Sequence, residues 1–168
     1  LDRMRAAVAY DELPRSIALK LKYGRKVALA RTMARYMAPL GGDWPEDAIV
    51  VPVPLHRWRL WGRGFNQSAL VARELARLWR LRADMTALRR VKRTRPLKGL
   101  NYVQRRKAVA GAFRATSKFD GRSVILIDDV LTSGSTAEAC SRALRRAGAG
   151  RVELICWARV VRPSQLMR

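Results

Sequence analysis

The sequence predicts an α/β fold in which a mainly parallel, twisted sheet carries helices on both faces. Short runs of aliphatic residues, too short for helices, alternate along the chain with amphipathic segments. Such alternation is typical of parallel strands joined by crossover helices. At 168 residues the chain is long enough for one compact core. Apolar residues make up 49% and charged residues 29%, a balance typical of globular proteins and not of disordered ones.

The first half of the chain is predicted to hold three helices and one strand. Pro14 suits a first helical turn, and apolar residues recur at helical spacing as far as Gly24. Pro39 ends a second helix, and Asn66 or Ser68 can cap a third. The expected elements are a helix over 14–24, a helix over 27–37, a strand over 49–54 that breaks at its second proline, and a helix over 66–81.

The second half is predicted to alternate strands with a basic loop and one helix. Residues 92–107 are basic and contain Pro96 and Gly99, so we expect a mobile loop there. We assign residues 1–48 to a small amino-terminal helical hood and residues 49–168 to the core domain. The other expected elements are strands over 85–91, 109–113, 124–127 and 152–161, and a helix over 135–146 that stops at Gly148.

The run from Val124 to Thr136 is the most informative segment. Four aliphatic residues suit a buried strand, and the adjacent carboxylates of Asp128 and Asp129 follow at its carboxyl end. Ligands of open α/β sheets bind at this end of the strands, and a helix amino terminus favours a phosphate. The segment therefore predicts a site for a ligand with a phosphate and hydroxyl groups; the alternative is a turn whose Ser135 or Thr136 only caps the next helix. The loop residues are Thr132, Ser133, Gly134, Ser135 and Thr136.

The charge balance points to an anionic partner. Thirty-five Lys and Arg against 13 Asp and Glu leave a formal net charge of +22. Such a charge favours nucleic acid, phosphorylated substrates or an anionic membrane surface. Trp58 and Trp61 lie among Arg57, Arg59 and Arg63, a mixture that suits stacking on bases. The alternative is an arginine-rich, solvated surface without a dedicated partner.

The two cysteines and the hydropathy pattern indicate a cytoplasmic protein. Cys140 and Cys156 belong to no metal-binding motif and are expected to be small buried residues. Lone thiols without a secretory signal suggest a reducing compartment. No apolar stretch approaches the length of a membrane span. We therefore expect a cytoplasmic location, no membrane span and no metal held by cysteine.

The segment 124–136 resembles the phosphoribosyl pyrophosphate (PRPP) binding motif of type I phosphoribosyltransferases. Three further parts narrow the resemblance: the run 51–56 (VPVPLH), the run 63–68 (RGFNQS), and Arg105-Arg106 ahead of 111–113. Together with 20–24 they resemble the ComF competence family of phosphoribosyltransferase-like proteins. The resemblance covers nearly the whole chain. Its members commonly carry an amino-terminal four-cysteine zinc module, which these residues do not contain.

The resemblance assigns a role to each part of the expected site. Asp128 and Asp129 would hold the ribose 2′- and 3′-hydroxyls, and residues 132–136 would wrap the 5′-phosphate. Residues 93–107 would form a lid, in which Arg95, Lys98, Arg105 and Arg106 meet the pyrophosphate charge. Mg²⁺ would bind with PRPP, largely through phosphate oxygens and water, with Asp128 and Asp129 as its protein candidates. Pyrophosphate would be received by Pro54, Leu55, His56 and Arg57.

Three functions follow from the resemblance. The first is transfer of phosphoribosyl to an unknown nitrogen acceptor, with Asp128, Asp129, Arg95 and Arg105 as catalytic residues. The second is a single-stranded-DNA-binding competence factor that acts with other competence proteins. The third is a PRPP-responsive regulator without turnover. This function stays open because Leu97 and Ala108 replace the family's usual glutamine and asparagine. An oligomer is compatible with all three functions. The nucleic-acid candidates are Arg57, Trp58, Arg59, Trp61, Arg63 and Arg106.

Overall fold

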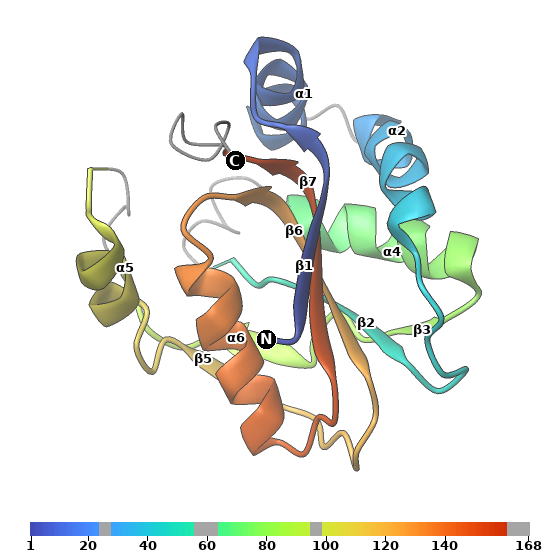
Figure 1. The fold of residues 1–168 in the computed structure, drawn as a ribbon, viewed down its shortest axis with the longest axis vertical. Helices are drawn as coiled ribbons and strands as arrows, with labels where there is room; N and C mark the ends of the chain where they lie inside the picture. The colour runs from blue at the N-terminus through green and yellow to red at the C-terminus, as the bar shows by residue number, and fades with distance from the viewer. Residues whose placement is uncertain (24–27, 56–63, 95–98, 161–168) are drawn as a thin grey trace, which may run out of the picture.

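The central feature of the fold is a five-stranded sheet in which all neighbouring strands are parallel. The structure is a computed structural model that describes residues 1–23, 28–55, 64–94 and 99–160. The strands lie in the order β1-β7-β6-β2-β3 (Figure 1). The predicted α/β fold class with a mainly parallel sheet is confirmed. The strand bounds are β1 Arg3–Ala9, β2 Ile49–Pro52, β3 Arg82–Ala83, β6 Val124–Leu131 and β7 Val152–Arg159.

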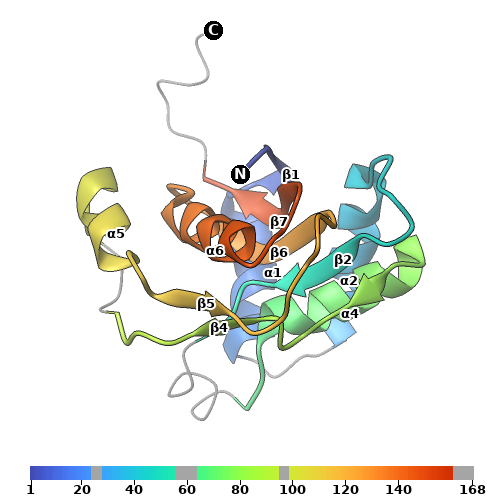
Figure 2. The ribbon, with the colours of Figure 1, turned by 90° about the horizontal axis from the view of Figure 1, so that it is seen from below.

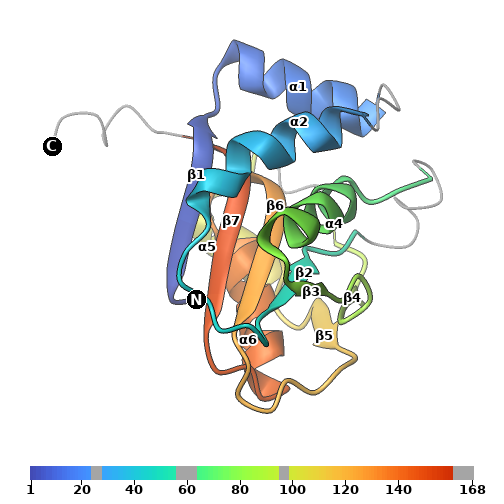
Figure 3. The ribbon, with the colours of Figure 1, turned by 90° about the vertical axis from the view of Figure 1, so that its right-hand side faces the viewer.

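Helices cover both faces of this sheet, as predicted. Helices α2 and α4 lie in front of the sheet in Figure 3, and α6 lies behind it. Helix α1 lies beyond the end of the sheet at which β7 finishes (Figure 1), and the indole N–H of Trp157 donates to the carbonyl of Pro14 at 3.1 Å. The bounds are α1 Glu12–Tyr23, α2 Ala28–Met37, a 3₁₀ turn Ala38–Leu40, α4 Gln67–Trp79, α5 Tyr102–Ala108 and α6 Ser135–Arg146.

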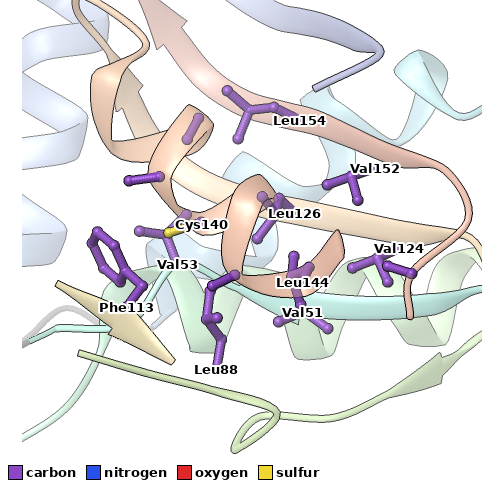
Figure 4. Packing of buried hydrophobic residues seen from close by; sticks show 14 of the residues in the cluster. Val51, Val53, Leu88, Phe113, Val124, Leu126, Cys140, Leu144, Val152 and Leu154 are labelled. Atoms are coloured by element: carbon purple, nitrogen blue, oxygen red, sulfur yellow. The ribbon is translucent and has the colours of Figure 1, made fainter. Parts of the chain in front are cut away.

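The core forms two layers because successive residues of a buried strand point to opposite faces. Val124 and Leu126 of β6 pack with α6 in one cluster, which Figure 4 shows from close by. Ile125 and Ile127 pack with α2 and α4 in the other. A strand that is buried on both faces has to be apolar throughout, which explains the continuous aliphatic run.

Strand β1 is an element that the sequence did not predict. It pairs with β7 at the edge of the sheet, with Arg3 opposite Glu153 and Arg5 opposite Ile155. The arginines make this strand hard to recognise in the sequence, because charged residues usually point to solvent. In the structure Arg5 instead forms an ion pair of 2.5 Å with Glu153. The division of the chain at residue 48 stays a prediction, but residues 3–9 belong to the central sheet and not to a helical hood.

A small hairpin replaces two of the predicted strands. The side chain of Asp84 accepts the N–H of Thr86 at 2.9 Å, and this turn separates β3 from β4 (Leu88–Arg90). Strand β4 pairs antiparallel with β5 (Phe113–Ala115), outside the main sheet, and Figure 2 shows the two side by side. The expected strand over 85–91 is therefore wrong in its first part. The expected strand over 109–113 is wrong, since Gly111 turns there with φ +65°.

Helix α5 corrects the prediction of a loop over 92–107. Asn101 and Gln104 form a capping box: Asn101 Oδ1 accepts from the backbone N–H of Gln104 at 2.9 Å, and Gln104 Oε1 accepts from that of Asn101 at 3.0 Å. This reciprocal pair was overlooked because the basic residues around it dominate the pattern. The part of the predicted lid at 95–98 lies outside the described residues.

Both cysteines are buried, as expected. Cys140 and Cys156 are buried free thiols, and burial raises the pKa of Cys156 to about 12. Trp79 packs edge-on against Trp44, with ring centroids 4.8 Å apart. Among the residues described, none of the helices has the length and apolar character needed to cross a membrane.

The turn before β7 gives a test of the packing. A Cβ on Gly150 would overlap the backbone carbonyl of Gly121, which cannot move as a side chain could. We expect Gly150→Ala to lower the free energy of unfolding by about 2 kcal/mol or more in urea titrations. The control is Gly111→Ala, which has positive φ but open space around it and should cost about 1 kcal/mol. Equal losses would contradict the close approach at Gly150.

Candidate functional site

The acidic pair lies within the last part of β6 and not after it. The strand continues past Ile127, with Asp128 paired to Cys156 and Leu131 to Arg159 in the parallel ladder with β7. The predicted strand end at 127 is therefore four residues too early. Because backbone pairing continues, the positions of both carboxylates are set by the sheet and not by a free loop.

Asp128 is partly buried, and its Oδ1 atom accepts two hydrogen bonds. One comes from the hydroxyl of Ser68 at 3.2 Å and the other from the backbone N–H of Asp129 at 2.9 Å. Burial raises the pKa of Asp128 to about 8, and the neighbouring charge of Asp129 adds to the rise. The carboxyl group is therefore mostly neutral near neutral pH before a ligand binds.

Asp129 is more deeply buried, with 9% of its surface exposed. Its Oδ2 accepts from Nε2 of Gln67 at 3.0 Å, and its Oδ1 accepts from the backbone N–H of Val130 at 2.8 Å. A buried carboxylate needs such donors, since losing water without replacement is costly. Each of its oxygens thus has a donor within the protein.

The side-chain donors to Asp128 and Asp129 come from the start of α4. Asn66 caps the helix by accepting the N–H of Ser68 at 3.1 Å, and its own amide donates to the carbonyl of Val53 at 3.1 Å. Val53 lies directly after β2, so Asn66 ties the end of that strand to the start of the helix. The next two residues, Gln67 and Ser68, then reach the acidic pair. The sequence predicted Asn66 or Ser68 as the cap, of which Asn66 is the one observed, and gave no indication that Gln67 and Ser68 reach Asp128 and Asp129. Two adjacent polar residues, Gln67 and Ser68, are buried at the start of this helix, and this unusual placement is the signal that could have revealed the contacts.

The loop after β6 leads into α6 without a side-chain cap. Gly134 is the N-cap residue, with φ +76°, a conformation that glycine adopts without strain. Ser135 and Thr136 lie inside the helix and do not cap it, so the alternative in which one of them serves only as a cap is wrong; the backbone N–H of Ser135 has the hydroxyl of Ser133 at 3.5 Å. The hydroxyls of Ser133 and Ser135 lie 3.0 Å apart. Backbone N–H groups, a helix dipole and hydroxyls therefore meet at one point, which suits an anion.

Arg105 lies against this loop. Its Nη1 donates to Oγ1 of Thr132 at 3.0 Å, and its Nε donates to the carbonyl of Leu100 at 2.8 Å. Its role as a catalytic residue stays a prediction, but its position is beside the expected phosphate loop. Arg106 of the same helix is exposed.

Two cavities have linings that include residues directly after strands of the main sheet. A cavity of about 380 Å³ is lined by Thr132, Ser133 and Gly134, together with Met4, Tyr102 and Arg159. A larger one has a volume of about 590 Å³. It is lined by Pro54 and Leu55 of the predicted pyrophosphate loop, by Asn66, and by Arg89 and Arg90 of β4 among others. The remaining candidates, His56, Arg57, Trp58, Arg59, Trp61, Arg63 and Arg95, lie outside the described residues.

The donor set fits a metal ion that is shared with a ligand. Across the described ranges, no group of three or more His, Cys, Asp or Glu side chains is placed to hold a metal. The two carboxylate side chains are hard oxygen ligands, and Mg²⁺ commonly takes one or two of these and completes its shell with phosphates and water. Asp128 and Asp129 could hold Mg²⁺ only in this shared manner.

Comparison with known proteins identifies the family. The family model described as "Phosphoribosyl transferase domain" matches residues 65–166, more than half of the chain. The chain belongs to the phosphoribosyl transferase domain family. The matched residues include α4, the acidic pair of β6 and the loop before α6.

Two relatives of this phosphoribosyl transferase domain protein are named for competence and for DNA utilization. It is 35% identical over 151 residues to Competence protein F of Haemophilus influenzae, covering 84% of this chain and 66% of that protein. It is 31% identical over 150 residues to the DNA utilization protein YhgH of Escherichia coli, covering 84% of this chain and 65% of that one. The predicted resemblance to the ComF family is confirmed, and the chain matches just under two thirds of each relative's length. A hypoxanthine phosphoribosyltransferase from Staphylococcus aureus is similar in structure, with a TM-score of 0.49 and 12% identity over 93% of this chain and 70% of that one.

The raised pKa of Asp128 predicts how stability changes with pH. The folded protein holds this proton up to a pKa of about 8, whereas the unfolded chain releases it near 3.8. Between these values the folded state binds more protons, so its stability falls as pH rises. Because asparagine imitates the neutral carboxyl, Asp128→Asn should gain stability relative to the parent from about pH 5 to about pH 8 in thermal unfolding.

Asp84 provides the control for this measurement. Burial alone would raise its pKa, but hydrogen bonds from the Thr86 backbone and from the Ser117 and Thr86 hydroxyls outweigh burial and lower it. Its contribution to stability is complete above its ordinary pKa, so the cost of Asp84→Asn should stay constant over the same pH range. A constant difference for Asp128→Asn as well would contradict the buried, neutral carboxyl.

Proposed function

We propose that this protein binds PRPP with Mg²⁺ and transfers its phosphoribosyl group to a nitrogen acceptor. The observation that carries the proposal is the pair Asp128–Asp129 near the end of β6, followed after a short loop by the amino terminus of α6, whose N-cap residue is Gly134. A ribose diol donates two hydrogen bonds, which the carboxyl oxygens accept. A 5′-phosphate suits the N–H groups of the helix and the hydroxyls of the loop. The phosphoribosyl transferase domain family membership supports the same ligand.

The proposed reaction is a displacement at the anomeric carbon of PRPP. The lone pair of the acceptor nitrogen forms the new C1–N bond while the C1–O bond to pyrophosphate breaks, and the acceptor's proton leaves to solvent or a nearby base. Positive charge develops on the ribose as the bond breaks. The carboxylate of Asp129, held by Gln67 and the Val130 N–H, lies where it can stabilise that charge.

The larger cavity supports a place for the leaving group. Pro54 and Leu55 border it from the loop after β2, and Arg89 and Arg90 border it from β4. Pyrophosphate is strongly anionic, and guanidinium groups bind phosphate oxygens with two parallel hydrogen bonds. Mg²⁺, when bound with PRPP, neutralises part of the pyrophosphate charge.

Removing both carboxylates tests the site. We expect Asp128→Asn combined with Asp129→Asn to weaken PRPP binding about a hundredfold in titration calorimetry with Mg²⁺, because each substitution replaces one acceptor oxygen by an NH₂ group that cannot accept from a ribose hydroxyl. Asp43→Asn combined with Asp47→Asn makes the same chemical change at exposed positions and should leave affinity unchanged. Unchanged affinity in the first variant, with its fold intact by circular dichroism, would refute this site. Release of pyrophosphate on adding candidate bases then separates turnover from binding alone.

A second candidate function is the binding of single-stranded DNA. The specific observation is that Arg89 of β4 lies directly opposite Arg114 of β5. Both side chains are exposed, and like charges in this arrangement destabilise a hairpin unless an anion lies over them. Lys92 and Arg93 continue the exposed basic surface along the chain. The names of the relatives, a competence protein and a DNA utilization protein, favour the same function.

The opposed arginines give a measurement for this second function. We expect Arg89→Ala combined with Arg114→Ala to weaken binding of single-stranded oligonucleotides in fluorescence anisotropy. The slope of log affinity against log salt should become shallower by about 1.4, since each phosphate contact on a single strand contributes about 0.7. The charge-matched control is Arg35→Ala combined with Arg146→Ala, two exposed residues on α2 and α6. Equal effects of the two pairs would place DNA elsewhere on the basic surface.

A further inference from the structure

Gln67 has a buried side-chain amide, and only one of its two ends has a hydrogen-bond partner among the described residues. The residue is 3% exposed, and its Nε2 donates to Asp129 at 3.0 Å. Its Oε1 is buried and has no hydrogen-bond partner among the residues that the structure describes. The two ends of the amide cannot be exchanged, because the carboxylate of Asp129 accepts and needs the NH₂ group as its donor.

An unpaired buried carbonyl is costly and uncommon. Leaving such an acceptor without a donor costs about 1–3 kcal/mol, and buried polar atoms in folded proteins nearly always have a partner. Capping does not explain Gln67, since Asn66 is the cap of α4. Packing alone does not explain the amide oxygen either, because filling the position does not require a buried acceptor; only the Nε2 end of the amide has a partner, in Asp129. The carbonyl is therefore better explained by a donor that arrives with a ligand.

The neighbouring oxygens show which kind of donor is missing. Asp129 receives hydrogen bonds from Gln67 and Val130, and Asp128 receives two on Oδ1, from Ser68 and the Asp129 N–H. In these contacts both carboxyl groups accept. The amide oxygen of Gln67 is a further acceptor, and it has no donor among the described residues, so it calls for a hydrogen-bond donor. Two adjacent hydroxyl groups on one ligand meet this need.

We propose that Gln67 contacts the ligand itself, with Oε1 accepting a hydrogen bond from one hydroxyl of a ribose diol while Nε2 holds Asp129. The inference rests on the proposed PRPP site and extends it from two residues to three. Ser68 has a different part: it acts through Asp128 and is a positioning residue. The start of α4 then determines which sugars the site accepts, since a deoxy sugar leaves an acceptor unpaired.

The test is a comparison of ligands and variants by titration calorimetry. The probes are ribose 5-phosphate and its 2-deoxy and 3-deoxy forms, and the variant is Gln67→Met, which keeps the length and removes the amide. We expect the variant to bind ribose 5-phosphate about tenfold more weakly than the parent, as for one lost hydrogen bond. For the deoxy form that lacks the contacted hydroxyl, parent and variant should bind equally. Equal weakening for all three ligands, or none, would overturn the inference.

A second comparison separates contact with the ligand from positioning of Asp129. If Gln67 acts only through Asp129, Gln67→Met should have no further effect in an Asp129→Asn background. If it contacts the ligand, the same weakening of about tenfold should persist there, as in a double-mutant cycle of independent contacts. Should Gln67→Met fail to fold, Gln67→Asn keeps an amide but withdraws it by one methylene and should give the same pattern. Failure of the parent to bind ribose 5-phosphate or PRPP would instead count against the proposed function.

Discussion

Two neighbouring carboxyl groups at the end of a buried strand set the conditions for the rest of this site. Asp128 and Asp129 are removed from water, so they need donors from the protein or must stay protonated. The structure does both: burial raises the pKa of Asp128 to about 8, and Asp129 receives a donor on each oxygen. The side-chain donors, Gln67 and Ser68, come from the first turn of α4, which must therefore begin beside β6. Asn66 secures that position through Val53 at the end of β2.

The residues of β6 that stabilise the fold are different from those that form the proposed ligand site. Along β6 the residues as far as Ile127 are fully buried between two helical layers, and polar function begins only at the last residues of the strand. Helix α6 contributes both, since its buried face packs on the sheet while its amino terminus meets the phosphate loop. A change in the layers should alter folding, whereas a change at the strand end should alter binding. The many basic residues belong to neither of these two groups, and they lie on surfaces such as the β4–β5 hairpin.

The parts of the fold with strong local signals were predictable from the sequence. The aliphatic run of β6, the strand before Pro54 and the amphipathic α6 each follow from hydrophobic periodicity, and proline or glycine marks the end of the last two. Strand β1 was not predictable in this way, because its Arg5 pairs with Glu153, which is 148 positions away in the chain. The contacts of Gln67 and Ser68 with the acidic pair span 62 and 60 positions, so only the assembled sheet reveals them. Helix α5 was missed although its capping box was present in the sequence.

The most direct test of the account is a crystal structure of this chain with PRPP and Mg²⁺. The account predicts the 5′-phosphate on the backbone N–H groups at the start of α6, beside Ser133 and Ser135. It also predicts the ribose hydroxyls within hydrogen-bond distance of Asp128, Asp129 and Oε1 of Gln67. A ribose bound elsewhere, for example in the cavity of about 590 Å³ with the acidic pair untouched, would contradict it.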